Sequence, residues 1–347
     1  MKDVRTEVGV VPESPQVEQT AVQAAEQPAP QASTGARSRV VLVTGATGLV
    51  GSHTCRELAR RGWTIRAIVR SPTKAGERLA GVPVQTVLGD LRSSDTVRAA
   101  VRGVDAIVHL AAIAIERRDE SYEDVNTGTT IALVEAARAE GVRRFVHMSQ
   151  NGSSSASPYR FLRSKGAAQD AVQASDLEWT VLRPSVIFGP EDEFVTVLAR
   201  LVRLSPVVYP LPGGGTARFQ PVFVDDVARV IATALERPGS VRQTYPMGGP
   251  AALTLRQMIE RVLLAMHTER VLIPAPVFVL RPLIAAAQYV LPRPPVTTSL
   301  LDLLAVDNTV GDAGVWSTFR VVPVPFAPEE LTYLRNITVR EAWRSLW

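Results

Sequence analysis

The sequence predicts an α/β protein: a Rossmann-type, doubly wound parallel sheet flanked by helices, with a smaller C-terminal lobe. Three observations predict this fold. Short apolar runs alternate with stretches of helical spacing, and a three-glycine turn follows the first apolar run. Hydrophobic residues make up 46% of the 347-residue chain, which is enough to bury a large core. Strand–helix alternation of this length is typical of parallel βαβ units with right-handed crossovers.

The first strand and the turn after it carry most of the prediction. Residues 40–43 are apolar, as expected for a strand covered on both faces. Gly45 permits a sharp turn, Gly48 permits close approach of a pyrophosphate, and Gly51 permits tight packing of the next helix on the strand. The N-terminus of that helix offers free amide groups to phosphates. The residues predicted to bind a dinucleotide here are Gly45, Thr47, Gly48, Leu49, Val50 and Gly51.

The remaining elements follow in order. Strands are predicted at residues 64–69, 84–88, 106–110, 145–148, 179–188 and near 244–248. Helices are predicted at residues 52–61, 94–102, 129–140, 161 to about 175, 194–204 and 227–235, with one more capped by Thr254. Asp225 is expected to be the N-cap of the helix at 227–235, a structural role.

Ligands of doubly wound sheets bind at the carboxyl ends of the strands, so residues there are candidates. Arg70 ends the second strand, where an acidic residue would indicate NAD(H), and its cation favours the 2′-phosphate of NADP(H). NAD(H) remains the alternative, with Arg70 as a solvated arginine. The other candidates are Asp90 and Leu91 at the adenine edge, the small residues Leu110, Ala111 and Ala112 beside the nicotinamide ribose, and Pro184 and Ile187 in the turn that covers the nicotinamide end.

Lys165 is a candidate for both cofactor binding and catalysis. The chain has only three lysines among its 38 basic residues, so arginine is its usual cation. Composition alone therefore does not explain a lysine at the start of the helix after the fifth strand. Its compact charge suits a hydrogen bond to the nicotinamide ribose better than a guanidinium fork does.

Composition argues against several other classes of protein. The net charge of +4 is carried by scattered arginines, so no nucleic-acid interface is predicted. With one cysteine, Cys55, and four histidines without ligand spacing, neither a disulfide framework nor a metal site is expected. Residues 1–38 contain no aromatic residue and no targeting pattern, which predicts a disordered tail and a cytoplasmic protein. The predicted domains are a dinucleotide-binding domain at 39–255, with lobe segments from about 190, and a mostly helical lobe at 256–347.

Residues 271–292 are the most apolar stretch of the chain. Four prolines and Arg281 interrupt it, so it does not predict a transmembrane span. Arg281 and Gln288 are seven residues apart and are expected on one helical face. Two interpretations stay open. One is a lobe helix packed over the substrate cleft. The other is a helix that binds peripherally to the inner face of a membrane or to a protein partner.

The motifs TGATGLVG, GDL, HLAA, RSK, RPSVIFGP, QPVFVDDVA and MGGP occur in this order across about residues 38–255. In that order they resemble the extended and atypical branch of the short-chain dehydrogenase/reductase superfamily. RFVHMS, FLRSK, LRPSVIFGPEDEF, LPGGG and DNTV further resemble the nucleotide-binding accessory subunit of respiratory complex I and its bacterial relatives, some linked to ubiquinone biosynthesis. The resemblance implies a Rossmann fold, a nicotinamide dinucleotide, and a respiratory or quinone-biosynthesis complex as partner.

The chain departs from this family at the positions that handle protons. Active members carry a tyrosine four residues before the lysine, and Phe161 stands there in this chain. Tyr159 lies six residues before Lys165 and faces elsewhere on a regular helix, although a non-helical start would turn it inward. Ser149 is one place early for the family's serine or threonine. The candidate catalytic residues are therefore Lys165, Ser149 and Tyr159.

These residues lead to three hypotheses. The first is an atypical NADP(H)-binding protein, weakly active or inactive, that serves a quinone-linked respiratory or biosynthetic system as a subunit or assembly factor. The second is an NADP-dependent reductase, epimerase or dehydratase of a small carbonyl, sterol-like, quinone-like or sugar-nucleotide substrate. The third is a redox sensor in which bound NADP alters a protein partner.

Overall fold

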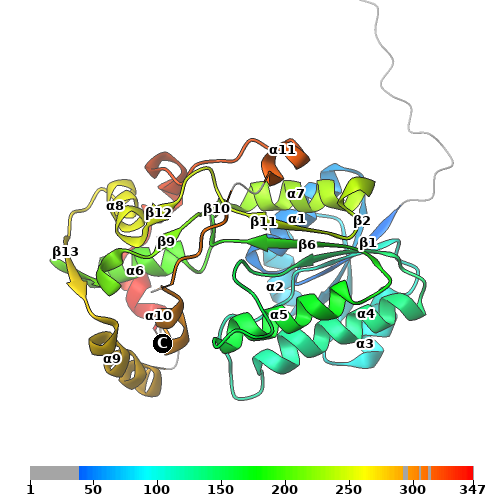
Figure 1. Cartoon of the computed structure of the whole chain (residues 1–347), viewed down its shortest axis with the longest axis horizontal. Helices are drawn as coiled ribbons and strands as arrows, with labels where there is room; N and C mark the ends of the chain where they lie inside the picture. Colours follow the sequence, from blue (N-terminus) through cyan, green and yellow to red (C-terminus); the bar gives the residue numbers. More distant parts are fainter. Residues whose placement is uncertain (1–38, 292–295, 305, 312–313, 347) are drawn as a thin grey trace, which may run out of the picture. The chain divides into compact units, whose positions relative to one another are not determined.

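Seven parallel strands form the central sheet, in the order β11-β6-β5-β4-β1-β2-β3 (Figure 1). The computed structural model describes residues 39–291, 296–304, 306–311 and 314–346, so the prediction for residues 1–38 lies outside the described residues. The order reverses between β1 and β4, which is the topological switch point of a doubly wound sheet. The strands are β1 (Val40–Thr44), β2 (Thr64–Val69), β3 (Val84–Leu88), β4 (Ala106–His109), β5 (Arg144–Met148), β6 (Glu178–Pro184) and β11 (Gln243–Met247).

Helices cover both faces of this sheet, as the fold prediction requires. One face packs against α1 (Leu49–Arg60) and α7 (Val224–Glu236), which also pack against each other. The opposite face packs against α3 (Ser94–Val101), α4 (Thr129–Ala139) and α5 (Arg160–Gln173) (Figure 1). The side chains of β1, β2, β4, β5 and β6 are mostly buried in these two layers, whereas the edge strands β3 and β11 are more exposed. The predicted Rossmann-type fold is confirmed.

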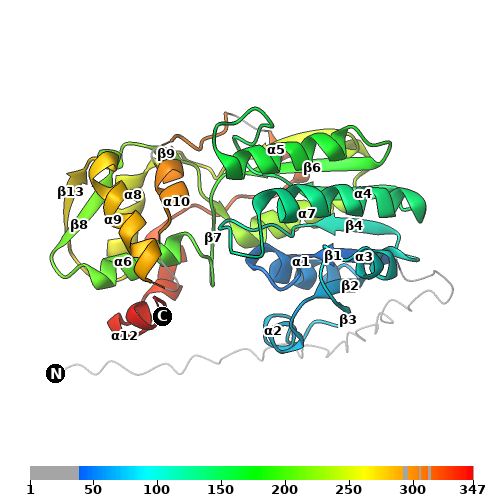
Figure 2. The ribbon, with the colours of Figure 1, turned by 90° about the horizontal axis from the view of Figure 1, so that it is seen from below.

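A separate apolar cluster forms the core of the lobe. It is built around α6 (Val195–Leu204) and α8 (Leu255–Ala265), with Phe188, Phe219 and Phe326 packed among them. Figure 2 shows these helices beside β8 and β13. The smaller lobe elements are β7 (Ile187–Phe188), β8 (Val208–Pro212), β9 (Arg218–Phe219), β10 (Val222–Phe223), β12 (Leu253–Thr254), β13 (Val271–Ala275), α9 (Val277–Val290), α10 (Thr298–Leu304), η4 (Pro328–Leu334) and α12 (Val339–Arg344). The short helix α11 (Val315–Phe319) instead packs against α7 and β11 of the main domain.

The strands of the main sheet agree with the sequence prediction except at one point. The sequence predicts a single strand at 179–188, but β6 ends at Pro184 and β7 pairs with β10 in a different sheet. Ser185 donates its amide to Met247 O and its hydroxyl to Asn308 O, which turns the chain out of the main sheet. Among the elements without a counterpart in the prediction are α2 (Pro72–Arg78), the π-helix η1 (Glu123–Gly128) and the 3-10 turns η2 (Gly213–Gly215) and η3 (Pro238–Ser240).

Two helix starts also need correction. The first helix begins at Leu49 rather than Ser52, because Gly48 already accepts the amide of Ser52 (3.0 Å). Asp225 is not an N-cap, because α7 begins at Val224 and its N-cap is Phe223. Asp225 instead lies in the first helical turn and pairs with Nδ1 of His53 on α1 (2.5 Å). The predicted cap at Thr254 is confirmed as a capping box with Gln257.

The apolar stretch at 271–292 forms β13 followed by α9. None of the residues of α9 is buried, and Phe278, Leu283 and Tyr289 are more than half exposed. Arg281 pairs with Asp302 of α10 (3.4 Å), and Gln288 accepts the amide of Thr298 (2.8 Å), so these two side chains share one face as predicted. Within the described ranges, no helix has both the length and the apolar character needed to cross a bilayer.

Candidate functional site

The glycine turn lies at the switch point of the sheet, between the carboxyl ends of β1 and β4. Gly45 has φ of +70°, and a Cβ there would lie 2.8 Å from the amide nitrogen of Ala111. A Cβ at Gly51 would lie 2.0 Å from Gly45 O, so the helix touches the turn backbone directly. At Gly48 the nearest atom to such a Cβ is Gly45 O at 3.2 Å, and the residue is exposed. The structure thus gives Gly45 the turn role and Gly51 the packing role that the sequence predicts, and the approach of a pyrophosphate at Gly48 stays a prediction.

Backbone donors at this turn are left without helical acceptors. The first amide that finds an acceptor in α1 is that of Ser52, so the amides of Leu49, Val50 and Gly51 precede the hydrogen-bonded helix. Thr47 lies beside them and its carbonyl accepts Nε of Arg78 (3.3 Å). Free amides at a helix N-terminus, together with its dipole, form an anion-binding geometry.

Two arginines meet at the carboxyl ends of β2 and β3. Arg70 is largely exposed and pairs with the buried carboxylate of Glu120. Arg92 donates to both oxygens of Asp90, with Nη2 to Oδ2 at 2.9 Å and Nε to Oδ1 at 3.1 Å. These hydrogen bonds from Arg92 hold the pKa of Asp90 below its ordinary value. Asp90 is therefore an ionised acceptor beside two cations, and Leu91 is half-buried next to it.

Arg78 is a functional candidate that the sequence reasoning missed. Its guanidinium donates to Thr47 O of the glycine turn and pairs with Glu191, in the loop after β7. Its side chain is only 19% exposed, so the charge is held against the turn. No sequence signal indicated it, because the helix α2 that carries it has no counterpart in the sequence prediction.

Lys165 is on α5, and its ammonium reaches the carboxyl end of β5. Most of the hydrogen-bonding capacity of this ammonium is unused. Its side chain is buried, and Nζ donates to Met148 O (2.7 Å). An ammonium has three donors, and no second acceptor for them is found among the described residues. Burial lowers the pKa of Lys165 to about 8. The group is therefore poised to donate to ligand oxygens.

The proton-handling positions lie around Lys165. Ser149 is buried, and its Oγ shares a hydrogen bond with Oγ of Ser153 (2.9 Å). Phe161 packs edge-on against the ring of Tyr122, with ring centroids 5.7 Å apart. Tyr159 is the N-cap of α5 and has an extended backbone (φ −83°, ψ 117°), so the helix does have the non-helical start that an inward tyrosine requires.

A small cavity of about 180 Å³ lies beside these aromatic residues. Tyr159, Phe161, Pro158 and Leu303 contribute apolar lining from the start of α5 and from α10. Its charged lining is paired: Arg160 binds Glu116 (2.6 and 3.0 Å) and Glu123, and Asp302 binds Arg281. The cavity thus offers aromatic surface and neutralised charge.

The other predicted residues lie along the same edge. Leu110 and Ala111 follow β4 and receive support from Oγ1 of Thr44, which accepts their two amides at 3.3 and 3.4 Å. Ala112 is exposed. Pro184 ends β6 and is buried, and Ile187 is half-buried at the start of β7. The structure therefore brings the predicted residues to one edge of the sheet.

A late segment of the chain, residues 306–311, crosses this edge at β6 and β11; we call it the crossing segment. Asn308 accepts the hydroxyl of Ser185 (2.6 Å) and the side-chain amide of Asn151 (2.9 Å). Val310 donates its amide to Oε1 of Gln220 (2.9 Å), whose Nε2 donates to Gly249 O. The motifs QNG, RPS, QPV, GGP and DNTV thus meet in one hydrogen-bonded cluster, which the sequence reasoning did not foresee.

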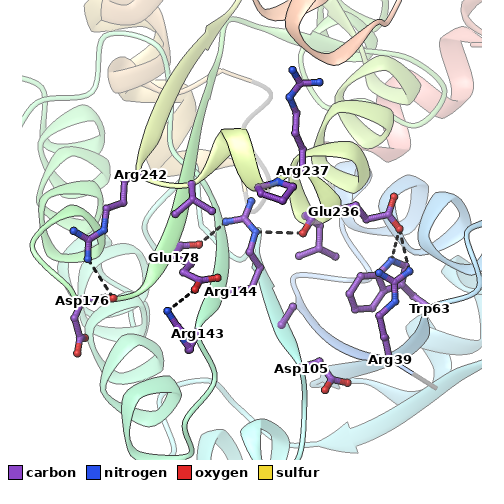
Figure 3. A pocket seen from close by; sticks show the side chains of 14 residues that line it. Arg39, Trp63, Asp105, Arg143, Arg144, Asp176, Glu178, Glu236, Arg237 and Arg242 are labelled. Atoms are coloured by element: carbon purple, nitrogen blue, oxygen red, sulfur yellow. Dashed lines mark hydrogen bonds and ion pairs between the residues drawn. The ribbon is translucent and has the colours of Figure 1, made fainter. Parts of the chain in front are cut away.

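A larger cavity of about 650 Å³ opens at the opposite, amino edge of the sheet (Figure 3). Much of its charged lining is already paired: Arg39 binds Glu236 (3.4 Å) and Arg143 binds Glu178 (2.6 Å). Arg144 is satisfied by oxygens of the chain itself, including Ala234 O (2.5 Å), Thr180 Oγ1 (2.7 Å) and Ser240 Oγ (3.0 Å). We therefore place the candidate site at the carboxyl edge, despite the size of this cavity.

Comparison with known proteins agrees with this geometry. The model of the NAD dependent epimerase/dehydratase family matches residues 41–248, which contain the glycine turn, Lys165 and the strands of the main sheet. The UDP-glucose 4-epimerase of Thermus thermophilus, solved in complex with NAD, superposes with a TM-score of 0.63 over 88% of this chain and 99% of that chain. At 22% identity this likeness shows the fold.

Two curated relatives are more similar in sequence. The mitochondrial NADH dehydrogenase (ubiquinone) 1 alpha subcomplex subunit 9 of Arabidopsis thaliana is 34% identical over 244 residues, which are 65% of this chain and 59% of that protein. The ceramide reductase of Caulobacter vibrioides is 34% identical over 200 residues, 57% of this chain and 62% of that protein. The chain thus spans about three fifths of the length of these relatives.

Proposed function

The chain belongs to the NAD dependent epimerase/dehydratase family, and on that premise we propose that it binds a nicotinamide dinucleotide at the carboxyl edge of its sheet and transfers hydride slowly if at all. The observation that supports this most is a contrast within one site. The glycine turn and Lys165 retain free donors, while Phe161 occupies the position of the family's proton donor.

The residues of the chain fit such a cofactor. Leu49, Val50 and Gly51 would bind the pyrophosphate through their amides, beside a glycine turn that has no room for side chains at Gly45 and Gly51. The unused donors of Lys165 would bind ribose hydroxyls near the nicotinamide. A dinucleotide would therefore satisfy backbone and side-chain groups that the described protein leaves open.

We propose NADP(H) in preference to NAD(H). Arg70 lies where NAD-specific members carry an acidic residue, and Arg92 adds a second cation at the same corner. The side chain of Arg70 is 62% exposed, so its guanidinium is free to exchange Glu120 for a ligand phosphate. Replacing Arg70 by alanine should weaken NADPH binding and leave NADH binding nearly unchanged.

When bound, a reduced nicotinamide supplies a hydride. The chain would then have to deliver a proton to the accepting atom, and the side chain of Phe161 has none to give. Loss of a positioned acid lowers a rate by about 10²- to 10⁴-fold. Ser149 and Lys165 remain in place to bind and orient, so the site retains cofactor binding with little turnover.

We further propose that the protein serves a quinone-linked respiratory or ubiquinone-biosynthesis system as a subunit or assembly factor. The relative from Arabidopsis, named as a subunit of an NADH dehydrogenase (ubiquinone), supports this. The exposed apolar side chains of α9 (Phe278, Leu283 and Tyr289) offer a surface for peripheral membrane contact or for a protein partner. Flotation of the purified chain with phospholipid vesicles tests the membrane contact, and Phe278→Asp should abolish it.

Isothermal titration calorimetry with NADPH and NADH tests the binding proposal. We expect heat of binding for both, with tighter binding of NADPH. No heat with either cofactor at millimolar concentration would refute it. Brisk NADPH-dependent reduction of a carbonyl compound, lost in Lys165→Ala, would refute the slow-turnover part alone. Phe161→Tyr should raise turnover if the rest of the site is assembled.

A second candidate function is the reduction of an uncharged, apolar carbonyl compound. The cavity beside Phe161 favours it, because its aromatic lining and paired charges suit such a substrate better than a nucleotide diphosphate. The ceramide reductase relative points the same way. Tyr159 would donate the proton to the carbonyl oxygen and recover one from water. NADPH oxidation in the presence of a long-chain ketone, reduced at least tenfold in Tyr159→Phe, would support this function; unchanged activity in that variant would exclude the tyrosine.

A further inference from the structure

We infer that His109 is a positioning residue: as a neutral imidazole in one tautomer, it joins the glycine turn, the loop after β4 and the helix that carries Lys165. This inference rests on the proposed dinucleotide site, whose opposite walls these segments form. The four histidines have no metal-ligand spacing in the sequence, and none of them is a candidate site residue there. The side chain of His109 is buried, and both of its ring nitrogens are hydrogen-bonded.

The contacts of His109 run across the sheet and into the helix layer. Thr44 and His109 are register partners on β1 and β4, and Oγ1 of Thr44 lies 2.7 Å from Nδ1 of His109. On the other side of the ring, Nε2 lies 2.8 Å from Oγ1 of Thr130 on α4. Thr44, Thr130 and His109 are all at most 1% exposed, so solvent does not compete for these bonds.

The direction of each hydrogen bond follows from the available protons. Thr130 has one hydroxyl proton and donates it to Asn126 O (2.7 Å), so its oxygen must accept from His109. Nε2 of His109 therefore carries a proton. In a neutral ring Nδ1 is then an acceptor, and Thr44 donates to it. The oxygen of Thr44 remains free to accept the amides of Leu110 and Ala111.

At the Thr44 end, this series of hydrogen bonds holds the glycine turn and the loop after β4 together. Thr44 immediately precedes Gly45, and the Ala111 amide that it accepts lies 2.8 Å from the position of a Gly45 Cβ. The glycine turn and the loop after β4 are thus in direct backbone contact. The side-chain oxygen of Thr44 accepts the amides of Leu110 and Ala111, and its carbonyl oxygen lies 3.3 Å from the same Leu110 amide, so Thr44 holds the start of the loop through both its side chain and its backbone.

At the Thr130 end, the same series of hydrogen bonds reaches α5, the helix that carries Lys165. Asn126, whose carbonyl accepts from Thr130, uses its side-chain amide to bind both the amide and the carbonyl of Ile113 (2.8 and 3.2 Å). The same side chain donates to Oγ of Ser164, next to Lys165 (3.1 Å). The loop from Leu110 to Ile113 is therefore held at both ends by one network, and His109 is its middle member.

Burial, with a cation nearby, keeps the ring of His109 neutral. The ring of His147, on the neighbouring strand, stacks on it with centroids 5.4 Å apart, and Lys165 places a cation nearby. Burial, together with that cation, lowers the pKa of His109 to about 3. A second proton on the ring would also remove the acceptor that Thr44 requires. The tautomer with the proton on Nε2 is therefore fixed throughout the ordinary pH range.

Thr130→Val tests the inference in the full-length chain, because Thr130 lies in the helix layer and is completely buried. The variant removes the acceptor of Nε2–H with little change in shape. We expect NADPH affinity, measured by calorimetry, to fall about tenfold as the loop loses its fixed position. Thr130→Ser keeps the hydroxyl and should restore the wild-type affinity. Thr54→Val is a matched control, since Thr54 is equally buried and no partner for its hydroxyl is found among the described residues.

The outcomes separate this inference from the proposed function. If the wild-type chain binds NADPH and Thr130→Val binds it equally well, the positioning role is refuted and the cofactor site stands. If the wild-type chain binds neither NADPH nor NADH, both are refuted. The ¹⁵N spectrum of wild-type His109 gives an independent test should the variant fail to fold. The Nε2–H tautomer supports the inference, and the Nδ1–H tautomer or the imidazolium form overturns it.

Discussion

Each of the two edges of the main sheet holds a buried cation, but the two cations differ in how many protein oxygens accept from them. At the amino edge, Arg144 is largely buried, yet oxygens on three neighbouring segments accept its guanidinium protons. At the carboxyl edge, Lys165 is also buried, but a single carbonyl of the described residues accepts from it. Burial lowers the pKa of both cations, to about 10 for Arg144 and about 8 for Lys165.

This difference shows that the size of a cavity is a poor guide to function. The amino edge has the larger cavity, but much of its charged lining is already paired. At the carboxyl edge the helix amides and the lysine keep unused donors around a turn without side chains. Several unused donors that converge on one turn favour this edge as the candidate ligand site, because an unmade buried bond is costly.

Gly51→Ala should give the largest effect on NADPH affinity. It tests whether the glycine turn at the carboxyl edge binds the cofactor. The new methyl group would lie 2.0 Å from Gly45 O, so α1 and the turn must separate. We expect NADPH affinity to fall more than a hundredfold and the unfolding free energy to fall by about 3 kcal/mol. Gly76→Ala is the control, because that glycine lies in α2 with open space around it. Wild-type affinity in Gly51→Ala would contradict the assignment of the turn.

Arg144→Met tests the amino edge. The variant removes the guanidinium donor of Ala234 O, Leu235 O and Glu178 O, so we expect the unfolding free energy to fall by about 3 kcal/mol. NADPH affinity should not change, because none of these groups lies at the carboxyl edge. Denaturant unfolding and calorimetry measure the two quantities. A large loss of affinity with unchanged stability would break the comparison.

The pH dependence of stability should also separate the two edges. Burial lowers the pKa of Lys165 to about 8 from an ordinary value of 10.5, so between these pH values the unfolded state binds more protons than the folded state. The unfolding free energy should therefore rise between pH 8 and 10.5, by up to about 3 kcal/mol. Lys165→Met should remove this rise. An identical pH profile in that variant would show that the lysine is not the group responsible.

The smallest effect is expected for Thr180→Val, which parallels Thr130→Val on the opposite edge. Thr180 is buried in the Arg144 network and donates to Ser240 O (2.7 Å). Loss of its hydroxyl should lower the unfolding free energy by about 1 kcal/mol, measured by denaturant titration, and leave NADPH affinity unchanged. If both threonine variants lowered affinity equally, the network around His109 would have no special connection to the site.

The fold was predictable from local pattern because each strand and its following helix have their signals within about 30 residues. The apolar run at 40–43 and the glycines after it predicted β1, its turn and α1, with an error of three residues at the helix start. The end of β6 was missed because its cause is remote in the sequence. Ser185 is held by Met247 and Asn308, and no local signal at Ser185 reports those partners.

Residues of the candidate site could be predicted where a single side chain has the chemical role by itself. Lys165 and Phe161 could be identified from their place after the fifth strand. The network around His109 could not, because it depends on which strands are neighbours and on which hydroxyl has a proton to give. Arg78 was missed for a similar reason, since only the folded chain places it against Thr47. The domain boundary at 255 and the roles of the site residues stay predictions.

The crossing segment has a consequence for how the protein is made. Asn151 and Asn308 are 157 positions apart, and their hydrogen bond helps to close the edge where the cofactor would lie. A growing chain folds from its N-terminus, so the main sheet can form on the ribosome well before residue 308 emerges. Until then Ser185, Asn151 and Gln220 lack their partners in the crossing segment, and the edge stays incomplete. A polypeptide released before residue 308 is made would thus have the main sheet but lack the crossing segment at its carboxyl edge. We expect quality-control proteases to degrade such a product.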